Sequence, residues 1–161
     1  MTGTDQAKQL EDLVDEGTIA MFMTMIGDEH TSRPLSIAEV RADRLAFLID
    51  ATTDWAHAVR EGTAVVHVAI SDVRKNTYVS LQGAASVALD HEEIDRLWNP
   101  GAAAYFDGKD DPGVGVLRFD ASSGEYWDAP GGRIGSLIAL VKAAVAGDDA
   151  AGEQGQVATQ A

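Results

Sequence analysis

Apolar residues alternate without a break between positions 19 and 25, and this pattern limits the fold more than any other feature of the chain. The odd positions carry isoleucine and methionine, and the even positions carry alanine, phenylalanine and threonine. A side-chain period of two is typical of a β-strand, and a strand that is apolar on both faces is typically covered on both. The sequence therefore predicts a strand over residues 19–25 that is buried on both sides.

The segments after this strand predict a small binding site. A turn, two strands, a polar loop and a short helix are expected over residues 27–30, 32–40, 45–49, 50–54 and 55–60. Arg33 enters the first of these strands, and the loop of hydroxyls and carboxylates leaves the second. We expect the two to meet at the rim of a barrel, where they can hold an anionic ligand.

The rest of the chain mixes β-branched runs with short helical patterns. Further strands are predicted over residues 63–70, 77–89, 114–119 and 124–127. Helices are predicted over residues 6–15, 91–98, 102–106 and 134–146. Gly83 interrupts the longest strand and predicts a bulge or bend there. The pattern predicts a mainly β (α+β) fold, an antiparallel barrel with peripheral helices. Residues 1–146 are expected to form one domain and residues 147–161 a disordered tail.

The acidic balance of the chain excludes several classes of partner. Twelve Lys and Arg residues stand against 26 Asp and Glu, a formal net charge of −14. Nucleic acid and anionic membrane surfaces need a basic face, so neither is expected. A small phosphate remains compatible, because one arginine and a few backbone N–H groups can bind it locally. No cysteine, signal-peptide pattern or long apolar run is present, so we expect a cytoplasmic protein.

No catalytic or metal-binding motif stands out. The four histidines are scattered along the chain, at His30, His57, His67 and His91. None has the spacing of a metal site, and His67 is expected to be a core or half-buried strand residue. Asp107, Asp110 and Asp111 lack the spacing of a calcium loop and are interpreted as a solvated turn. No metal site is predicted, and no residue is assigned as a general acid or base.

Three residues in the first half of the chain are suited to binding. Arg33 presents a guanidinium fork that matches phosphate or carbonyl oxygens. Pro34 removes one ladder donor and indicates an edge or bulge. Thr53 precedes a helix, so its hydroxyl and the first helical N–H groups form an anion site. Their spacing leaves a simpler interpretation open, in which Thr53 only caps the helix and Arg33 is a surface charge.

Short fragments in a fixed order extend over nearly the whole chain, up to Gly147. They are SRPL at 32–35, FLID at 47–50 before Thr53, YVS at 78–80 before Gly83, LWNP at 97–100, YFDG at 105–108, DDP at 110–112, LRF at 117–119 and EYWD at 125–128. In their order and spacing the chain resembles the general stress protein group of the pyridoxamine 5′-phosphate oxidase-like, FMN-binding split-barrel proteins. The most specific fragment is LWNP.

The resemblance implies a six-stranded antiparallel split β-barrel that forms a homodimer with FMN at the subunit interface. The residues implied around the flavin are Arg33, Pro34, Leu35, Ile49, Asp50, Thr53, Trp55 and Trp127. Thr53 is expected to bind the phosphate, and Trp127 or Trp98 to approach from the partner subunit. For Trp98 the interpretation as a helix anchor in the core is favoured over a flavin contact.

Trp55 departs from the family pattern, which usually has a lysine at this position to reach the phosphate. Loss of one charge-assisted hydrogen bond, about 1.5–3 kcal/mol, weakens binding about ten- to a hundredfold. Either Trp55 stacks on or covers the flavin ring, or the site has changed its ligand. Arg60 and Lys75 are alternative sources of the missing charge.

The resemblance implies a stress-related, flavin-dependent oxidoreductase with FMN, or alternatively FAD or a deazaflavin. Two other functions stay open: a non-catalytic flavin-binding or stress-response protein, and a split-barrel dimer that has lost flavin binding. Oxidation of pyridoxamine phosphate itself is not expected, because the sequence offers no basic cluster for a second phosphate.

Overall fold

The computed structural model describes residues 9–128 and 153–156, and the statements below refer to these residues. The strands are β1 (Ile19–Ile26), β2 (Glu29–Ser36), β3 (Glu39–Arg41), β4 (Arg44–Asp50), β5 (Val65–Asp72), β6 (Thr77–Ala88), β7 (Val114–Asp128) and β8 (Glu153–Gln156). The helices are α1 (Leu10–Leu13), α2 (Asp54–Glu61), α3 (His91–Leu97) and α4 (Pro100–Tyr105). This composition confirms the predicted mainly β class.

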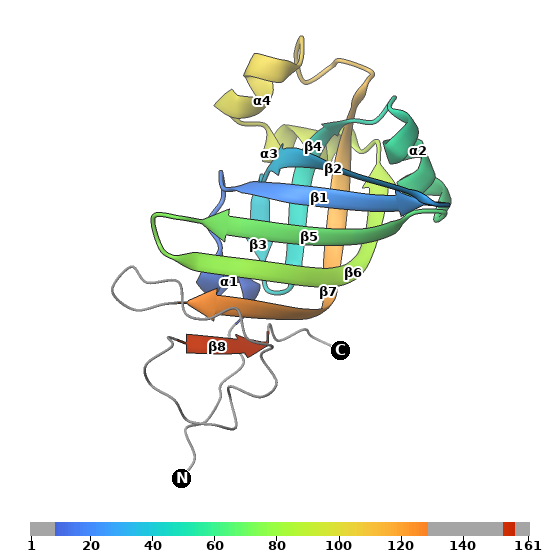
Figure 1. Cartoon of the computed structure of the whole chain (residues 1–161). Helices are drawn as coiled ribbons and strands as arrows, with labels where there is room; N and C mark the ends of the chain where they lie inside the picture. Colours follow the sequence, from blue (N-terminus) through green and yellow to red (C-terminus); the bar gives the residue numbers. More distant parts are fainter. Residues whose placement is uncertain (1–8, 129–152, 157–161) are drawn as a thin grey trace.

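The strands form one antiparallel sheet in the order β2-β1-β5-β6-β7-β4-β3, and β8 pairs with β7. The sheet curls around the core, with α2 at one end of the barrel and α3 and α4 together beside β4 (Figure 1). Its edge strands, β2 and β3, are not paired with each other in the described part of the chain. The result is a split barrel with more strands than the six expected.

The core lies on the concave side of the sheet. Phe22 and Phe47 are fully buried there, and their ring centroids are 6.4 Å apart in an edge-on arrangement. Leu45, also on β4, and Val68 and Leu81 from β5 and β6 belong to the same cluster. Because each strand places alternate residues inward, a period of two is enough to assemble this core.

The expectation that the first strand is buried on both sides is wrong. In β1, Ala20, Phe22 and Thr24 are buried, whereas Ile19 is 53% exposed and Met21 is 39% exposed. The helices cover the ends and one flank of the barrel, and the face formed by β1, β5 and β6 carries no helix (Figure 1). The sequence pattern reports apolar character on both faces, but it does not say whether a second layer covers them.

Two other boundaries differ from the predictions. The strand expected over 32–40 is divided, because the chain turns after β2 and continues as β3. The strands expected over 114–119 and 124–127 are one continuous strand, β7, which bends so that its first part pairs with β4 and its last part with β8.

A bulge lies between Gln82 and Gly83 of β6, as predicted. It allows the two longest strands, β6 and β7, to bend together.

The ends of the chain are described only in part. In the predicted helix over 6–15, α1 occupies Leu10–Leu13, and Val14 is already extended. Within 147–161, expected to be a disordered tail, residues 153–156 instead form β8 on the edge of β7. The predicted helix over 134–146 lies outside the described residues, and the domain boundary at 146 stays a prediction. No described helix has the length and apolar character needed to cross a bilayer.

The helix starts follow the capping residues. The Thr53 hydroxyl accepts a hydrogen bond from Ala56 N at 3.4 Å at the start of α2. The Asp90 carboxylate accepts bonds from two N–H groups in the first turn of α3, and the Asn99 side chain caps α4. Gly62 ends α2 with a positive φ of 75°, a conformation that favours glycine. These short-range rules explain why the predicted helices lie close to the observed ones.

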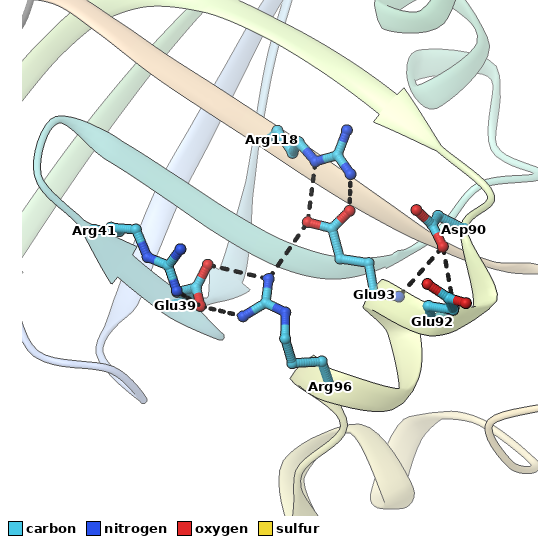
Figure 2. A network of polar contacts seen from close by, with 7 residues as sticks. All are labelled: Glu39, Arg41, Asp90, Glu92, Glu93, Arg96 and Arg118. Carbon is cyan, nitrogen blue, oxygen red and sulfur yellow. Dashed lines mark hydrogen bonds and ion pairs between the residues drawn. The ribbon is translucent and has the colours of Figure 1, made fainter.

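An ionic network fastens α3 to the sheet, as Figure 2 shows. The Arg118 guanidinium of β7 binds the Glu93 carboxylate of α3, with an Nε–Oε1 distance of 3.0 Å. Arg96, also on α3, forms ion pairs with Glu93 and with Glu39 of β3, and Arg41 pairs with the same Glu39. The hydrogen bond from Arg96 lowers the pKa of Glu39. Since α4 follows α3 almost directly, the network also fixes the position of α4.

Candidate functional site

A cavity of about 970 Å³ lies between two walls of the molecule. One wall comes from β2, the end of β4 and the start of α2, and the other from α4 and the loop before β7. The sequence-predicted residues that line it are Arg33, Pro34, Leu35, Ile49, Asp50, Thr53 and Trp55. Its size is at the upper end of the range of about 300–1,000 Å³ for small-molecule sites.

Arg33 is the most unusual of these residues. Its Nη2 donates hydrogen bonds to Thr31 Oγ1 at 2.6 Å and to Thr24 Oγ1 at 3.1 Å. Its Nη1 is buried and has no hydrogen-bond partner, and no carboxylate of the described residues forms an ion pair with it. Burial lowers the pKa of Arg33, although a guanidinium stays charged. A buried donor without an acceptor is unfavourable, so this atom indicates a missing anionic or carbonyl partner.

The guanidinium of Arg33 lies over the indole ring of Trp55. The guanidinium carbon of Arg33 lies 4.5 Å from the centre of the indole ring, within the range of a cation–π contact. The other neighbour of the ring is Phe22, at a centroid distance of 5.6 Å, which ties it to the core. Trp55, which occupies the sequence position of the lysine in the family pattern, therefore lines the cavity and orients the guanidinium of Arg33.

The loop between β4 and α2 places polar groups at the cavity wall. Asp50 Oδ1 accepts hydrogen bonds from the backbone N–H and the hydroxyl of Thr52, and these bonds lower the pKa of Asp50. The Thr53 hydroxyl donates to Asp50 O at 3.1 Å as well as capping α2. Asp50 is therefore a fixed, ionised carboxylate, and Thr53 lies at the helix start next to it.

The far wall contains residues that the sequence did not assign to the site. They are Asn99, Gly101, Ala102, Tyr105, Phe106, Asp111, Pro112 and Gly113, with Ser36, Ala38 and Leu48 nearer the sheet. Most belong to the fragments LWNP, YFDG and DDP, which were interpreted only as markers of the fold. The interpretation of Asp111 as part of a solvated turn is wrong: it is half-buried, it lines the cavity, and its Oδ1 accepts from Gly113 N at 2.9 Å.

Trp127 does not line this cavity. It lies on β7 opposite Tyr78 of β6, half-buried, and its indole Nε1 is buried without a partner. A role for Trp127 in the site of a partner subunit stays a prediction. Trp98 is packed against the smaller core cluster and lies 6.3 Å from the ring of Phe106, which agrees with its interpretation as a core anchor.

The charge of the cavity differs from that of a typical phosphate site. Arg33 is the one lysine or arginine among its described lining residues, and Asp50 and Asp111 are the carboxylates. Neither Arg60 nor Lys75, the alternative sources of a second cation, lines the cavity. Lys75 is instead paired with Asp15.

His67 lies on a strand, as predicted. His67 is half-buried on the outer face of β5, where its Nε2 lies 3.0 Å from Ser80 Oγ, and burial lowers the pKa of His67. In the described ranges no group of three or more His, Asp or Glu side chains is arranged to hold a metal ion.

The barrel is open between its edge strands, β2 and β3, and the cavity is lined partly by β2. This arrangement places the chain in the class of split-barrel proteins. The sequence profile of the family described as "Pyridoxamine 5'-phosphate oxidase like" matches residues 5–150, so the chain belongs to that family. The chain matches none of the curated proteins with which it was compared.

Solved structures with the same fold include several stress proteins. A protein from Jannaschia sp. CCS1 assigned as general stress protein 26 is 29% identical, with 93% of this chain and 94% of that chain covered and a TM-score of 0.67. The general stress FMN/FAD binding protein of Xanthomonas citri is 26% identical, with coverages of 70% and 80% and a TM-score of 0.58. A protein from Clostridium acetobutylicum related to general stress protein 26 is 20% identical, with coverages of 73% and 84% and a TM-score of 0.64.

Proposed function

We propose that this chain is a homodimeric flavin-binding protein that holds FMN in the cavity and acts as a stress-related oxidoreductase. The observation that carries the proposal is the buried, unpartnered Nη1 of Arg33 at the wall of a cavity large enough for a flavin. The similarity to the FMN/FAD binding protein of Xanthomonas citri supports the choice of ligand.

The cavity residues suggest how the flavin is held. Arg33 would donate to the phosphate or to a ring carbonyl, and Thr53 and the first N–H groups of α2 would bind phosphate oxygens. Leu35 would provide apolar surface for the ring, with Pro34 at the strand edge. Ile49 also lines the cavity, although its side chain is only 2% exposed. Bound FMN would supply the hydride chemistry, and the protein would supply orientation.

A second subunit would complete the site. Ile19 and Pro34 line the cavity and also belong to the uncovered outer face of the sheet, next to the exposed Met21. That face continues to Val65, which is 63% exposed. An exposed apolar surface joined to a binding cavity is typical of an interaction surface, and a second copy would bury both. The cytoplasmic location stays a prediction.

Titration of the flavin-free protein with FMN tests the proposal directly. We expect quenching of flavin fluorescence with saturation at one FMN per chain, a yellow complex, and a dimer by light scattering. Faster reduction of the bound flavin by NADH or NADPH than of free FMN would support turnover, whereas binding without reduction would support storage. A protein that leaves FMN fluorescence unchanged at all concentrations would support the alternative of a barrel without flavin.

Replacing Trp55 with lysine should weaken FMN binding about three- to tenfold. The substitution restores the ammonium group of the family pattern, but it removes the cation–π contact that orients Arg33, which contributes about 0.5–2 kcal/mol. It also places two cations side by side. The same titration measures the effect, with Trp98→Phe as the control outside the cavity. Tighter binding in the lysine variant would show that the missing charge matters more than the indole.

A further inference from the structure

Three of the four methionines of the chain lie on one strand. Met21, Met23 and Met25 occupy alternate positions of β1, and Met1 is the fourth. Because successive side chains of a strand point to opposite faces, the three thioethers share the outer face of the sheet. Met21 is exposed there, and the other two are half-buried. No described helix covers this face, and β1 lies within it between β2 and β5 (Figure 1).

The cross-strand neighbours of Met21 leave its thioether open to solvent. Pro34 of β2 and Ala69 of β5 lie directly opposite it on either side. Residues directly opposite each other in an antiparallel pair are the closest neighbours on one face of a sheet. Both are shorter than methionine, which agrees with the 39% exposure of Met21. Small oxidants in solution can therefore reach this end of the methionine row.

Methionine is the one sulfur-containing residue type of this chain, which has no cysteine. Hydrogen peroxide oxidises an accessible thioether to a sulfoxide. A bond forms between sulfur and one peroxide oxygen as the O–O bond breaks, the sulfur loses two electrons, and the other oxygen leaves as water. The product is polar, and an apolar surface offers no hydrogen-bond donor to its oxygen. Oxidation therefore converts the apolar row into a polar one.

The methionine row adjoins the proposed flavin site. Met21 pairs with Pro34, and Pro34 and Ile19 both line the cavity. The proposed second copy would cover this face and complete the cavity, so it would bury the three thioethers as well. Sulfoxide oxygens in that position would lose their water without gaining a donor, which disfavours the assembled state. Oxidation of the row and assembly of the dimer therefore oppose each other.

We propose that Met21, Met23 and Met25 form an oxidation site, and that their conversion to sulfoxides by hydrogen peroxide keeps the protomers apart and releases the flavin. The inference rests on the proposed function for the second copy and for the flavin. Met21, the most exposed of the three, reacts first. Peroxide oxidises the free protomers, and the oxidised protomers no longer pair, so the dimer is depleted by mass action. Methionine sulfoxide is reduced enzymatically, which makes the change reversible.

Peroxide treatment of the flavin-free protein, followed by sedimentation equilibrium, tests the inference. We expect peroxide to raise the dimer dissociation constant at least tenfold, a difference of about 1.4 kcal/mol, and to weaken FMN binding with it. Peptide mass spectrometry should locate the first sulfoxide at Met21, and a methionine sulfoxide reductase should restore the dimer. Met21 should react several-fold more slowly at protein concentrations well above the dimer dissociation constant than at concentrations well below it.

Leucine and glutamine variants separate this effect from oxidation elsewhere. The triple variant Met21→Leu, Met23→Leu, Met25→Leu keeps apolar side chains of similar volume. Its dimer dissociation constant, whatever the starting value, should not change on peroxide treatment, although Met1 is still present. Met21→Gln introduces a polar group without peroxide and should weaken the dimer several-fold. Val73→Gln, the same change at an exposed residue in the turn after β5, should not.

The outcomes distinguish this inference from the proposed function. A peroxide-treated protein that pairs normally although Met21 is oxidised, an equal peroxide effect in the leucine variant, or normal pairing of Met21→Gln would overturn the inference and leave the flavin-binding dimer standing. An untreated protein that is monomeric at all concentrations would refute the homodimer and this inference with it. A dimer that separates on oxidation but never binds FMN would refute the flavin alone.

Discussion

Gly83→Ala should lower the midpoint of thermal unfolding by about 6–12 °C. A Cβ atom at this position would lie 2.1 Å from the carbonyl oxygen of Asp120 and 3.0 Å from Cα of Ala121. Both neighbours are backbone atoms of β7, so the clash is relieved only by moving the strand at the bulge. Overpacking typically costs about 1–3 kcal/mol, and we expect the upper end here because the atoms in the way are backbone atoms. Each kcal/mol shifts the midpoint by about 2–4 °C in a chain of this size.

Circular dichroism at fixed protein concentration measures this effect, because the proposed dimer would make the midpoint depend on concentration. Gly108→Ala is the matched control. Its Cβ would meet no atom within 4 Å, and its backbone does not have the positive φ that disfavours a side chain. We expect Gly108→Ala to shift the midpoint by no more than about 2 °C. Equal effects of the two substitutions would show that the bulge tolerates a side chain.

Arg33→Met should raise the dissociation constant for FMN about ten- to a hundredfold. Methionine retains the length of the stem and its contact with Trp55, but it removes the unpartnered Nη1 donor. A hydrogen bond from a charged group contributes about 1.5–3 kcal/mol, and 1.4 kcal/mol corresponds to tenfold in affinity. Fluorescence titration with FMN measures the change.

The stability of the ligand-free protein should respond much less to the same substitution. Without an anion, the desolvation of the buried Nη1 is uncompensated, and removing it offsets the loss of the Nη2 hydrogen bonds to Thr24 and Thr31, so Arg33→Met should shift the thermal midpoint by no more than about 4 °C. Arg60→Met is the control, since Arg60 is an exposed residue at the end of α2 that does not line the cavity. Comparable losses of FMN affinity in both variants would assign the phosphate contact to Arg60 and contradict the proposed role of Arg33.

The prediction of Arg33 and Thr53 illustrates how far sequence reasoning reaches into the site. Thr53 is recognisable because a hydroxyl before a helical pattern caps the helix, a rule that involves only the next few residues. Arg33 is recognisable from its guanidinium at the start of a predicted strand and from its place in the SRPL fragment, and the structure adds its burial and its unpartnered donor. The sequence does not reveal Asp111 and Tyr105 as lining residues, because about 50 to 60 positions separate them from the loop over residues 50–54, and no local pattern expresses that proximity.

The sequence by itself determined the elements that depend on near neighbours. The period of two in β1, the caps at Thr53 and Asp90 and the bulge at Gly83 follow from side-chain alternation, local hydrogen bonds and glycine geometry. Only the tertiary structure decided which face of β1 stays uncovered and which cations face the cavity. Those features depend on how the sheet curls and where α4 packs, and they arise from contacts between residues far apart in the chain.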